Sequence, residues 1–388
     1  MAVPGLAVRI KGSLALRVHM IVAGLVTAIW IVLLLLPDRP WHMREVLPAR
    51  SGSSSGQRVS VLIPARNEER VIGQCLAALS DQMLPLEIMV LDDGSTDHTQ
   101  KVACASSLDS LKVVEIPELP PGWTGKLWAL EQGLARVHTE WVLLLDADIA
   151  LGHGLLPTLL ATAERDGLGL ASVMATPALR GFWDRWLMPV FIYFFKWVYP
   201  FHRANDPTSR MAAAAGGCVL VKLEALHAIG GFSALRDAVI DDCTLARLVK
   251  RKGYPTWIGV SRSVRMLRAH AFGEIWQMVS RTAFAQLHYS YFALLLAMAG
   301  LLFVFALPPV LALSGPDGLV RLLGTASSFL LVLSYLPTAR FYDESPFWGI
   351  LLPLAAALFF LMSVHSALRY ARGTRTRWKG RTYDRNGS

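Results

Sequence analysis

The chain has 388 residues, which is enough for one large domain or two modest ones. Hydrophobic residues make up 53% of it and the mean hydropathy is +0.41, which is high for a soluble enzyme. The formal net charge of +9 comes largely from the ends, but no zinc-like or aromatic-interleaved motif accompanies it, so nucleic acid is not an expected partner. Four well-separated cysteines without a C-x-x-C pair predict free, buried thiols in a reducing compartment.

The apolar residues are concentrated in four runs at 20–36, 291–313, 322–336 and 347–363. Each approaches the roughly 20 residues needed to cross a bilayer, although the third run is short. The first run is longer than the core of a typical signal peptide and no small-residue cleavage site follows it, which favours an uncleaved anchor. The chain should therefore consist of an N-terminal tail (1–19), an anchor (20–36), a linker (37–57) with a Gly/Ser-rich stretch at 49–57, a central domain (58–280), a membrane region with two or three spans (281–366) and a basic tail (367–388).

The central domain alternates apolar strands with helices. Strands are predicted at 58–65, at the start of 86–99, at 111–117 and at 141–151, with helices at 65–82, 99–108 and 124–137. Strands that are apolar throughout, joined by helices, indicate an α/β fold with a mainly parallel sheet that is covered on both faces. Ligands bind beyond the carboxyl ends of the strands in such sheets.

Acidic residues stand where two of these strands end. Asp92 and Asp93 open the sequence DDGSTD, and Asp146 and Asp148 belong to DAD within WVLLLDADIAL (141–151). DDGSTD alone is explained about equally well by a helix cap, but the joint placement predicts one cleft that contains both motifs. In an extended D-x-D the two carboxylates point to the same side, which suits Mg²⁺ or Mn²⁺ bound to a diphosphate.

A third acidic pair, Asp241 and Asp242, precedes an amphipathic helix in DAVIDDCTLARLVKRKGYPTWIG (237–259). The pair would favour the dipole of that helix, or an Asp at the lip of the cleft would act as a general base toward an acceptor hydroxyl. Upstream, Gly216 and Gly217 in a small-residue loop would let the backbone approach a substrate closely.

The ordered set VSVLIPARNEE, VLDDGSTD, GKLWAL, LLLDADI, AAGGCVLV and IDDCTLARLVKRKGY resembles the family 2 inverting glycosyltransferases, over about residues 58–260. This resemblance implies a GT-A fold and a nucleotide-diphosphate sugar as donor. PPGWTGKLWAL, YPFHRANDP, AAAAGGC, AVIDDC, SRTAFAQLHYS and the WKGR tail resemble, more closely, the bacterial hopene-associated glycosyltransferases.

The resemblance implies roles for individual residues. A Mg²⁺ or Mn²⁺ ion would be bound by Asp146 and Asp148, with Asp148 the more direct ligand. Asp242 matches the catalytic base, and Asp241 stands where the family usually has Glu. The positions that match nucleotide-sugar-binding residues are Pro64, Ala65, Glu68, Asp93, Lys126 and Asp146.

Two segments concern the acceptor. Processive members of the family carry a Q-x-x-R-W motif, but IWQMVSRTAFAQL (275–287) has Arg281 without the Trp, which favours transfer of a single sugar. With Gly216 and Gly217, Arg281 is a candidate acceptor-side residue; an ordinary interfacial arginine is the alternative. The aromatic-rich segment 181–201 is predicted to be a membrane-interface helix, with a core helix pair as its alternative.

The predicted function is transfer of one sugar from a nucleotide-diphosphate sugar to a membrane lipid, with a hopanoid as the acceptor that the resemblance suggests. The alternatives are a polyprenyl-phosphate acceptor and a non-catalytic membrane scaffold that retains the fold. The expected location is the bacterial inner membrane with the central domain in the cytoplasm. Three crossings after that domain would place the basic tail outside, against the positive-inside tendency, unless 322–336 or 347–363 lies in the interface.

Overall fold

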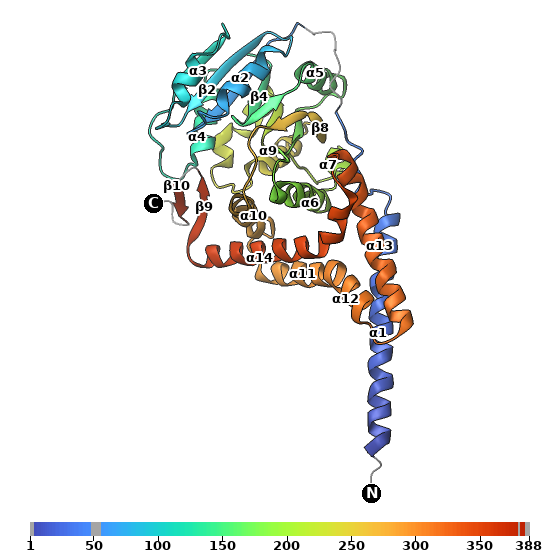
Figure 1. Cartoon of the computed structure of the whole chain (residues 1–388). Coiled ribbons are helices and arrows are strands. Elements are labelled where there is room, and N and C mark those ends of the chain that lie inside the picture. Colours follow the sequence, from blue (N-terminus) through green and yellow to red (C-terminus); the bar gives the residue numbers. More distant parts are fainter. Residues whose placement is uncertain (1–3, 48–55, 379–380, 385–388) are drawn as a thin grey trace.

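The computed structural model describes residues 4–47, 56–378 and 381–384. A domain built on one large sheet stands above a group of long helices, and the N-terminal helix projects away from it (Figure 1). The sheet has eight strands in the order β3-β2-β1-β4-β7-β6-β8-β5. Their bounds are β1 Val59–Ala65, β2 Leu86–Asp92, β3 Leu111–Glu115, β4 Trp141–Leu145, β5 Ile149–Leu151, β6 Leu170–Thr176, β7 Cys218–Lys222 and β8 Thr256–Met266.

Helices cover both faces of the sheet, as predicted. Strand side chains alternate between the faces, so that Val61 and Ile63 belong to one core and Leu62 to the other. The first core is covered by α2 Ile72–Ser80, α3 Thr99–Cys104 and α5 Leu155–Arg165. The second is covered by α4 Gly125–Leu134, α8 Leu223–Ile229, the short 3-10 helix η1 Phe232–Leu235 and α9 Asp241–Arg251.

The sheet is mixed rather than uniformly parallel. Strands β1 to β4 run parallel, whereas β7 is antiparallel to both β4 and β6. The predicted single strand 141–151 is wrong, because the chain turns at Asp146–Asp148 and β5 joins β8 at the far edge. The amide of Ile149 donates to the Asp146 carbonyl at 3.0 Å across this turn. Leaving the ladder there keeps the two carboxylates out of the buried sheet, where unpaired charge is costly.

The segment after the N-terminal helix packs on the sheet instead of forming a linker throughout. The amide of Leu47 donates to the Val260 carbonyl at 2.9 Å, and the amide of Val260 donates to the Glu45 carbonyl at 2.8 Å. The predicted linker therefore starts later than residue 37. Its Gly/Ser-rich stretch, 49–57, lies outside the described residues except for its last two positions.

Among the described residues, four helices are long and apolar enough to cross a membrane, one near the N-terminus and three after the sheet domain: Leu14–Leu35, Tyr291–Ser314, Gly318–Phe341 and Pro346–Ala371. The first belongs to α1 Pro4–Leu35, which begins well before the apolar run. The second is bent, since it comprises α11 Tyr291–Leu301, a π-helical turn at Leu302–Ala306 and α12 Leu307–Ser314. The others are α13 Gly318–Phe341 and α14 Leu352–Ala371, the latter preceded by a 3-10 turn at Pro346–Leu351.

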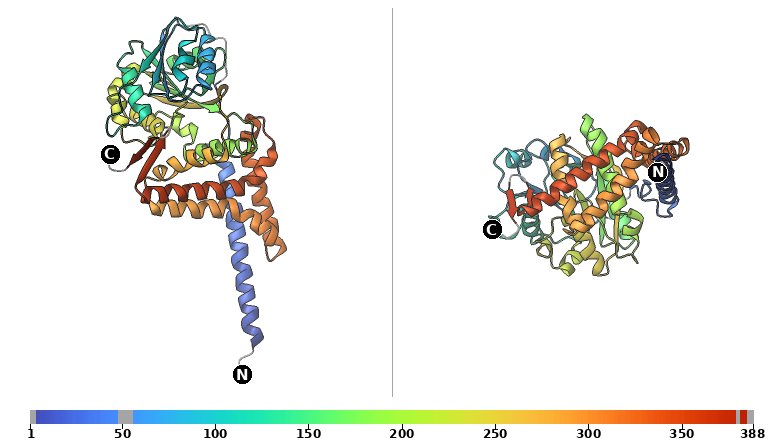
Figure 2. Two further views of the ribbon diagram at one scale, coloured as in Figure 1. Left: turned by 60° about the vertical axis from the view of Figure 1, so that its left-hand side comes forward. Right: turned by 90° about the horizontal axis from the view of Figure 1, so that it is seen from below.

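These helices do not run side by side. Helix α13 packs along α1 and forms a hairpin with α12. By contrast, α11 and α14 cross the direction of α1 beneath the sheet domain in each view (Figures 1 and 2). The predicted basic tail begins within α14 and continues as a hairpin of β9 Thr374–Trp378 and β10 Arg381–Asp384. Because β9 contacts α10 Phe272–Gln286, the hairpin lies on the same side of α14 as the sheet domain.

Helix α6 Phe182–Val198 joins the sheet domain to the apolar helices. Its Trp186 and Tyr193 are buried against α1, α13 and α14, and Lys196 pairs with Glu45 at 2.9 Å. Only the ends of α6 leave large apolar side chains exposed, so the predicted interface helix is for the most part a packed helix. The remaining short helix, α7 Phe201–Asn205, follows it directly.

Candidate active site

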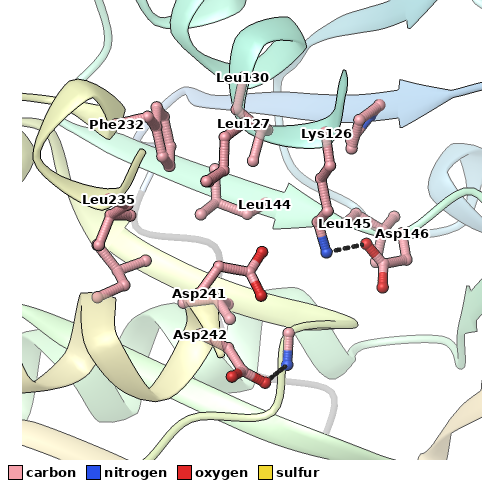
Figure 3. A pocket seen from close by; sticks show the side chains of 14 residues that line it. Lys126, Leu127, Leu130, Leu144, Leu145, Asp146, Phe232, Leu235, Asp241 and Asp242 are labelled. Atoms are coloured by element: carbon pink, nitrogen blue, oxygen red, sulfur yellow. Dashed lines mark hydrogen bonds and ion pairs between the residues drawn. The ribbon is translucent and has the colours of Figure 1, made fainter. Parts of the chain in front are cut away.

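One pocket brings together residues from four separate segments of the chain. Lys126 stands at the start of α4, Asp146 follows β4, Gly216 precedes β7, and Asp241 and Asp242 open α9. Lys126 and Asp146 lie on one side of the pocket and the α9 pair on the other (Figure 3). The rest of the lining is mostly apolar and includes Pro64, Leu127, Leu130, Leu144, Leu145, Val219, Phe232, Leu235 and Leu245. Pro64, Lys126, Asp146, Gly216, Asp241 and Asp242 are thus brought together as the sequence predicts.

The first turn of α4 positions the positively charged side chain of the pocket, Lys126. Thr124 caps this helix, and Lys126 Nζ lies 2.7 Å from Asp146 Oδ1. Burial alone would lower the Lys126 pKa, but Asp146, Asp241 and Asp242 raise it above its usual value, so the ammonium stays charged. For Asp146, burial outweighs Lys126 and raises its pKa. A fixed ammonium at this position suits a diphosphate.

Asp242 is held by two backbone amides. Its Oδ2 accepts from the Gly216 amide at 2.9 Å and its Oδ1 accepts from the Cys243 amide at 2.7 Å. Burial, together with the charge of Asp241, raises the Asp242 pKa to about 6. A carboxylate with this pKa is ionised at neutral pH and takes up a proton more readily than an ordinary aspartate, as a general base requires.

Glycine at 216 keeps the space between the two sides of the pocket open. A Cβ atom there would lie 3.3 Å from Asp242 Oδ2 and 3.6 Å from Lys126 Nζ. At Gly217, a Cβ atom would meet the Ile149 side chain at 3.3 Å. Both predicted glycines are therefore positions of close approach, where a Cβ atom would be tight, and at Gly216 the approach is to the polar groups of the site.

Asp148 faces a different cation from Asp146. Its Oδ2 lies 3.8 Å from Nη2 of Arg268, and its backbone carbonyl accepts from the Leu267 amide at 2.8 Å. Since the aspartates lie in a turn, the expectation of an extended D-x-D is not met. Within the described part of the chain, no group of three or more His, Cys, Asp or Glu side chains is placed to hold a metal ion. Two carboxylates nevertheless fit Mg²⁺ or Mn²⁺, which commonly take one or two carboxylates with substrate phosphates.

The DDGSTD loop divides its acidic residues between two tasks. Asp92 accepts from the Ser95 amide at 3.2 Å and Asp97 accepts from the Thr99 amide at 3.0 Å, so these two carboxylates organise the turn before α3. Asp93 is buried and lies 3.6 Å from Nη1 of Arg66. The helix-cap explanation does not hold strictly, because the N-cap residue of α3 is His98, but Asp92 and Asp97 do stabilise the turn before it, and Asp93 lies beside the arginine.

Comparison with known proteins shows what the domain is similar to. Residues 60–230 match the sequence model of glycosyl transferase family 2. The domain built on the large sheet is thus similar to the family 2 glycosyltransferases. Over 220 residues the chain is 26% identical to 4,4'-diaponeurosporenoate glycosyltransferase of Staphylococcus aureus (strain USA300), a match covering 56% of this chain and 58% of that protein. The chain thus spans little more than half of that relative.

The fold extends the likeness to the membrane part. Mannosyltransferase PcManGT of Pyrobaculum calidifontis, solved with GDP-Man and Mn²⁺, superposes with a TM-score of 0.53 at 20% identity, covering 91% of this chain and 99% of that one. The expected GT-A-like α/β domain with apolar helices at both ends is thereby confirmed. We call residues 58–266 the glycosyltransferase domain from here on.

Several residues near the site of the glycosyltransferase domain were not anticipated. Arg66 and Arg268 face Asp93 and Asp148, and no local motif marks either arginine. Tyr199, which donates to Gln286 of α10 at 2.8 Å, also contacts Cys243 beside the α9 pair. These residues could have been predicted only from knowledge of which distant segments of the chain lie side by side.

The remaining predicted residues lie outside the lining of this pocket. Ala65 pairs with Asp92 in the sheet, and the Glu68 amide, just after the carboxyl end of β1, donates to Thr99 Oγ1 at 2.7 Å. Arg281 lies on α10, where its Nε is buried without a hydrogen-bond partner among the described residues. Of the cysteines, Cys75, Cys218 and Cys243 are buried as predicted, but Cys104 is exposed.

Proposed function

We propose that the protein is an inverting glycosyltransferase that moves one sugar from a nucleotide-diphosphate sugar to a hydroxyl group of a membrane lipid. The observation that carries the proposal is Asp242, a carboxylate with a pKa of about 6 that shares a pocket with Lys126. A base and a cation in one site match the two needs of the reaction, which are to activate the acceptor and to neutralise the leaving diphosphate.

In this reaction the acceptor hydroxyl gives its proton to Asp242 as its oxygen bonds to the anomeric carbon. The bond between that carbon and the diphosphate oxygen breaks, and the nucleoside diphosphate leaves with the electron pair. Lys126 stabilises the charge that develops on it. A divalent cation held by Asp148 and Asp146 would supply further neutralisation of the diphosphate. Pro64, Ala65, Glu68 and Asp93 are proposed to hold the nucleotide at the end of β1, with Gly216, Gly217 and Arg281 toward the acceptor.

The acceptor is proposed to be apolar, and four helices that are long and apolar enough to cross a membrane support this proposal. We propose that the glycosyltransferase domain lies in the cytoplasm of a bacterial cell, where nucleotide sugars are made. The Staphylococcus aureus relative, by its name, acts on diaponeurosporenoate, a lipid-like acid. A hopanoid is the first acceptor to test. A polyprenyl phosphate is the second candidate. The name of the relative adds a lipid carboxylate, and an acceptor that is already ionised needs no general base.

The test is thermal stability of the detergent-purified protein against a panel of nucleotide sugars, with Mn²⁺ or with EDTA. Stabilisation by one donor that needs the cation and disappears in Asp148→Ala would support the site and identify the sugar. That donor, radiolabelled, is then incubated with hopanoid, polyprenyl phosphate and total lipid extract. Loss of hydroxyl glycosylation in Asp242→Asn supports the base, whereas full activity in that variant points to the acidic acceptor. A folded protein that no donor stabilises would point to the scaffold.

A further inference from the structure

A second cavity lies away from the candidate active site, between the glycosyltransferase domain and the end of α13. Its volume is about 340 Å³. The loop after β6 contributes Arg180, the second half of β8 contributes Arg262 and Arg265, and the chain following α13 contributes Asp343. The remaining lining residues, Thr176, Pro177, Ala178, Leu179, Met266, Phe341 and Tyr342, are mostly apolar.

The charge of this cavity is unbalanced, with three guanidinium groups and one carboxylate. Nη2 of Arg262 donates to Asp343 Oδ1 at 3.1 Å and to the Arg340 carbonyl at 3.0 Å, so that arginine and the acid are engaged with each other. The Nε of Arg265 donates to the backbone carbonyl of Arg262 at 3.1 Å. Because a carbonyl carries no net charge, this hydrogen bond does not neutralise the Arg265 guanidinium. Arg180 is exposed. The cavity is therefore suited to an anion bound by the guanidinium groups of Arg180 and Arg265.

The position of the cavity relative to the apolar helices indicates the level at which it would lie in a bilayer. Segment 38–47, which follows α1, is held on β8 at Val260 and Ser261, one residue before Arg262. Phe341 and Tyr342 mark the end of α13. The cavity thus lies where two candidate membrane helices, α1 and α13, both end on the side of the glycosyltransferase domain.

That level in a bilayer is occupied by lipid headgroups, and basic pockets beside membrane helices bind anionic ones. The cavity also offers a mixed surface, since Leu179, Met266 and Phe341 lie beside the arginines. The buried Tyr342 hydroxyl has no hydrogen-bond partner among the described residues, so the lining retains a polar group to satisfy. We propose that this cavity binds the phosphate of an anionic membrane lipid and docks the glycosyltransferase domain on the membrane surface.

The experiment compares ligands by thermal unfolding of the full-length protein in a neutral detergent, followed by tryptophan fluorescence. The ligands are dihexanoyl phosphatidylglycerol, dihexanoyl phosphatidylcholine and inorganic phosphate. We expect saturable stabilisation by phosphatidylglycerol, with clearly weaker effects of the other two. Equal stabilisation by inorganic phosphate would overturn the lipid assignment, and equal stabilisation by phosphatidylcholine would overturn the requirement for an anionic headgroup.

The variant for this test is R180Q/R265Q, which leaves Arg262 in its contacts with the end of α13. Each lost charged hydrogen bond is worth about 1.5 kcal/mol or more, so the apparent Kd for phosphatidylglycerol should rise at least about tenfold. K101Q/K112Q removes the same charge from exposed positions on α3 and on the edge strand β3, and its Kd should not change. An equal Kd in R180Q/R265Q and K101Q/K112Q would refute the site. If the first variant does not fold, R180Q alone should show the same direction of change.

Discussion

Asp242→Asn should stabilise the protein while it removes activity. The folded state raises the Asp242 pKa from 3.8 to about 6, so the folded protein binds this proton more tightly than the unfolded chain. A raised carboxyl pKa contributes stability at low pH that is lost as the pH rises through about 6. At about 1.4 kcal/mol per pH unit, the ionised group costs about 3 kcal/mol at pH 8 and about half of that at pH 5.

An asparagine is neutral at both pH values and escapes this cost. The side-chain amide nitrogen of the asparagine would face one of the two backbone N–H groups that donate to the carboxylate, and the lost hydrogen bond costs about 1 kcal/mol. The net gain in the free energy of unfolding at pH 8 is then about 2 kcal/mol. The apparent Tm should therefore rise by about 4–8 °C at pH 8 and by much less at pH 5. Both are measured by tryptophan fluorescence at one scan rate, with Asp109→Asn, at an exposed position, as the control. A gain that is the same at both pH values would refute the raised pKa.

Four further results are expected. In the wild-type enzyme kcat/KM should fall as the pH decreases below about 6, because the base becomes protonated, and a flat profile down to pH 5 would contradict this role. Lys126→Met should raise the donor Kd about tenfold or more in a binding titration, since it removes a charged contact with the diphosphate; an unchanged Kd would place the donor elsewhere. Asp148→Asn should abolish the Mn²⁺-dependent part of donor stabilisation, whereas retention of that part would remove Asp148 from the cation site. Lys196→Met should lower the apparent Tm by several degrees because the partly buried Glu45 is left unpaired, and adding Glu45→Gln should restore part of the loss.

The sequence was sufficient to predict that some of the candidate residues meet in one pocket, but Ala65, Glu68, Asp93 and Asp148 do not line it. It was not sufficient to predict how the chain passes between them. Pro64, Asp146 and Asp242 follow from a simple rule, since each lies at an end of a strand or helix that opens on one edge of the sheet. The course after Asp146 does not follow from that rule. A run that is apolar on both sides of DAD gives no indication that β5 crosses to the far edge and pairs with β8.

The unpredicted contacts have the same origin. Arg268 meets Asp148 only because β5 and β8 are neighbours, so the pair is visible after the strand order is known. Hydropathy likewise located the apolar helices, three of which are longer than the predicted runs, without indicating their direction. Direction depends on packing between helices, such as that of α10 on α14, and a local window contains no information about it.

The direction of α11 and α14 has a consequence for the bilayer itself. With α1 along the bilayer normal, these two helices would lie in the leaflet on the side of the glycosyltransferase domain and add their cross-section to that leaflet alone. Their exposed side chains, among them Phe292, Leu295, Leu354 and Leu361, are those of a surface embedded in hydrocarbon. A leaflet that contains extra protein area is less strained where the membrane curves so that this leaflet is convex. Binding of helices that lie in one membrane interface therefore depends on membrane curvature. The protein would then act as a wedge, and its distribution among membranes would depend on their shape as well as on their lipids.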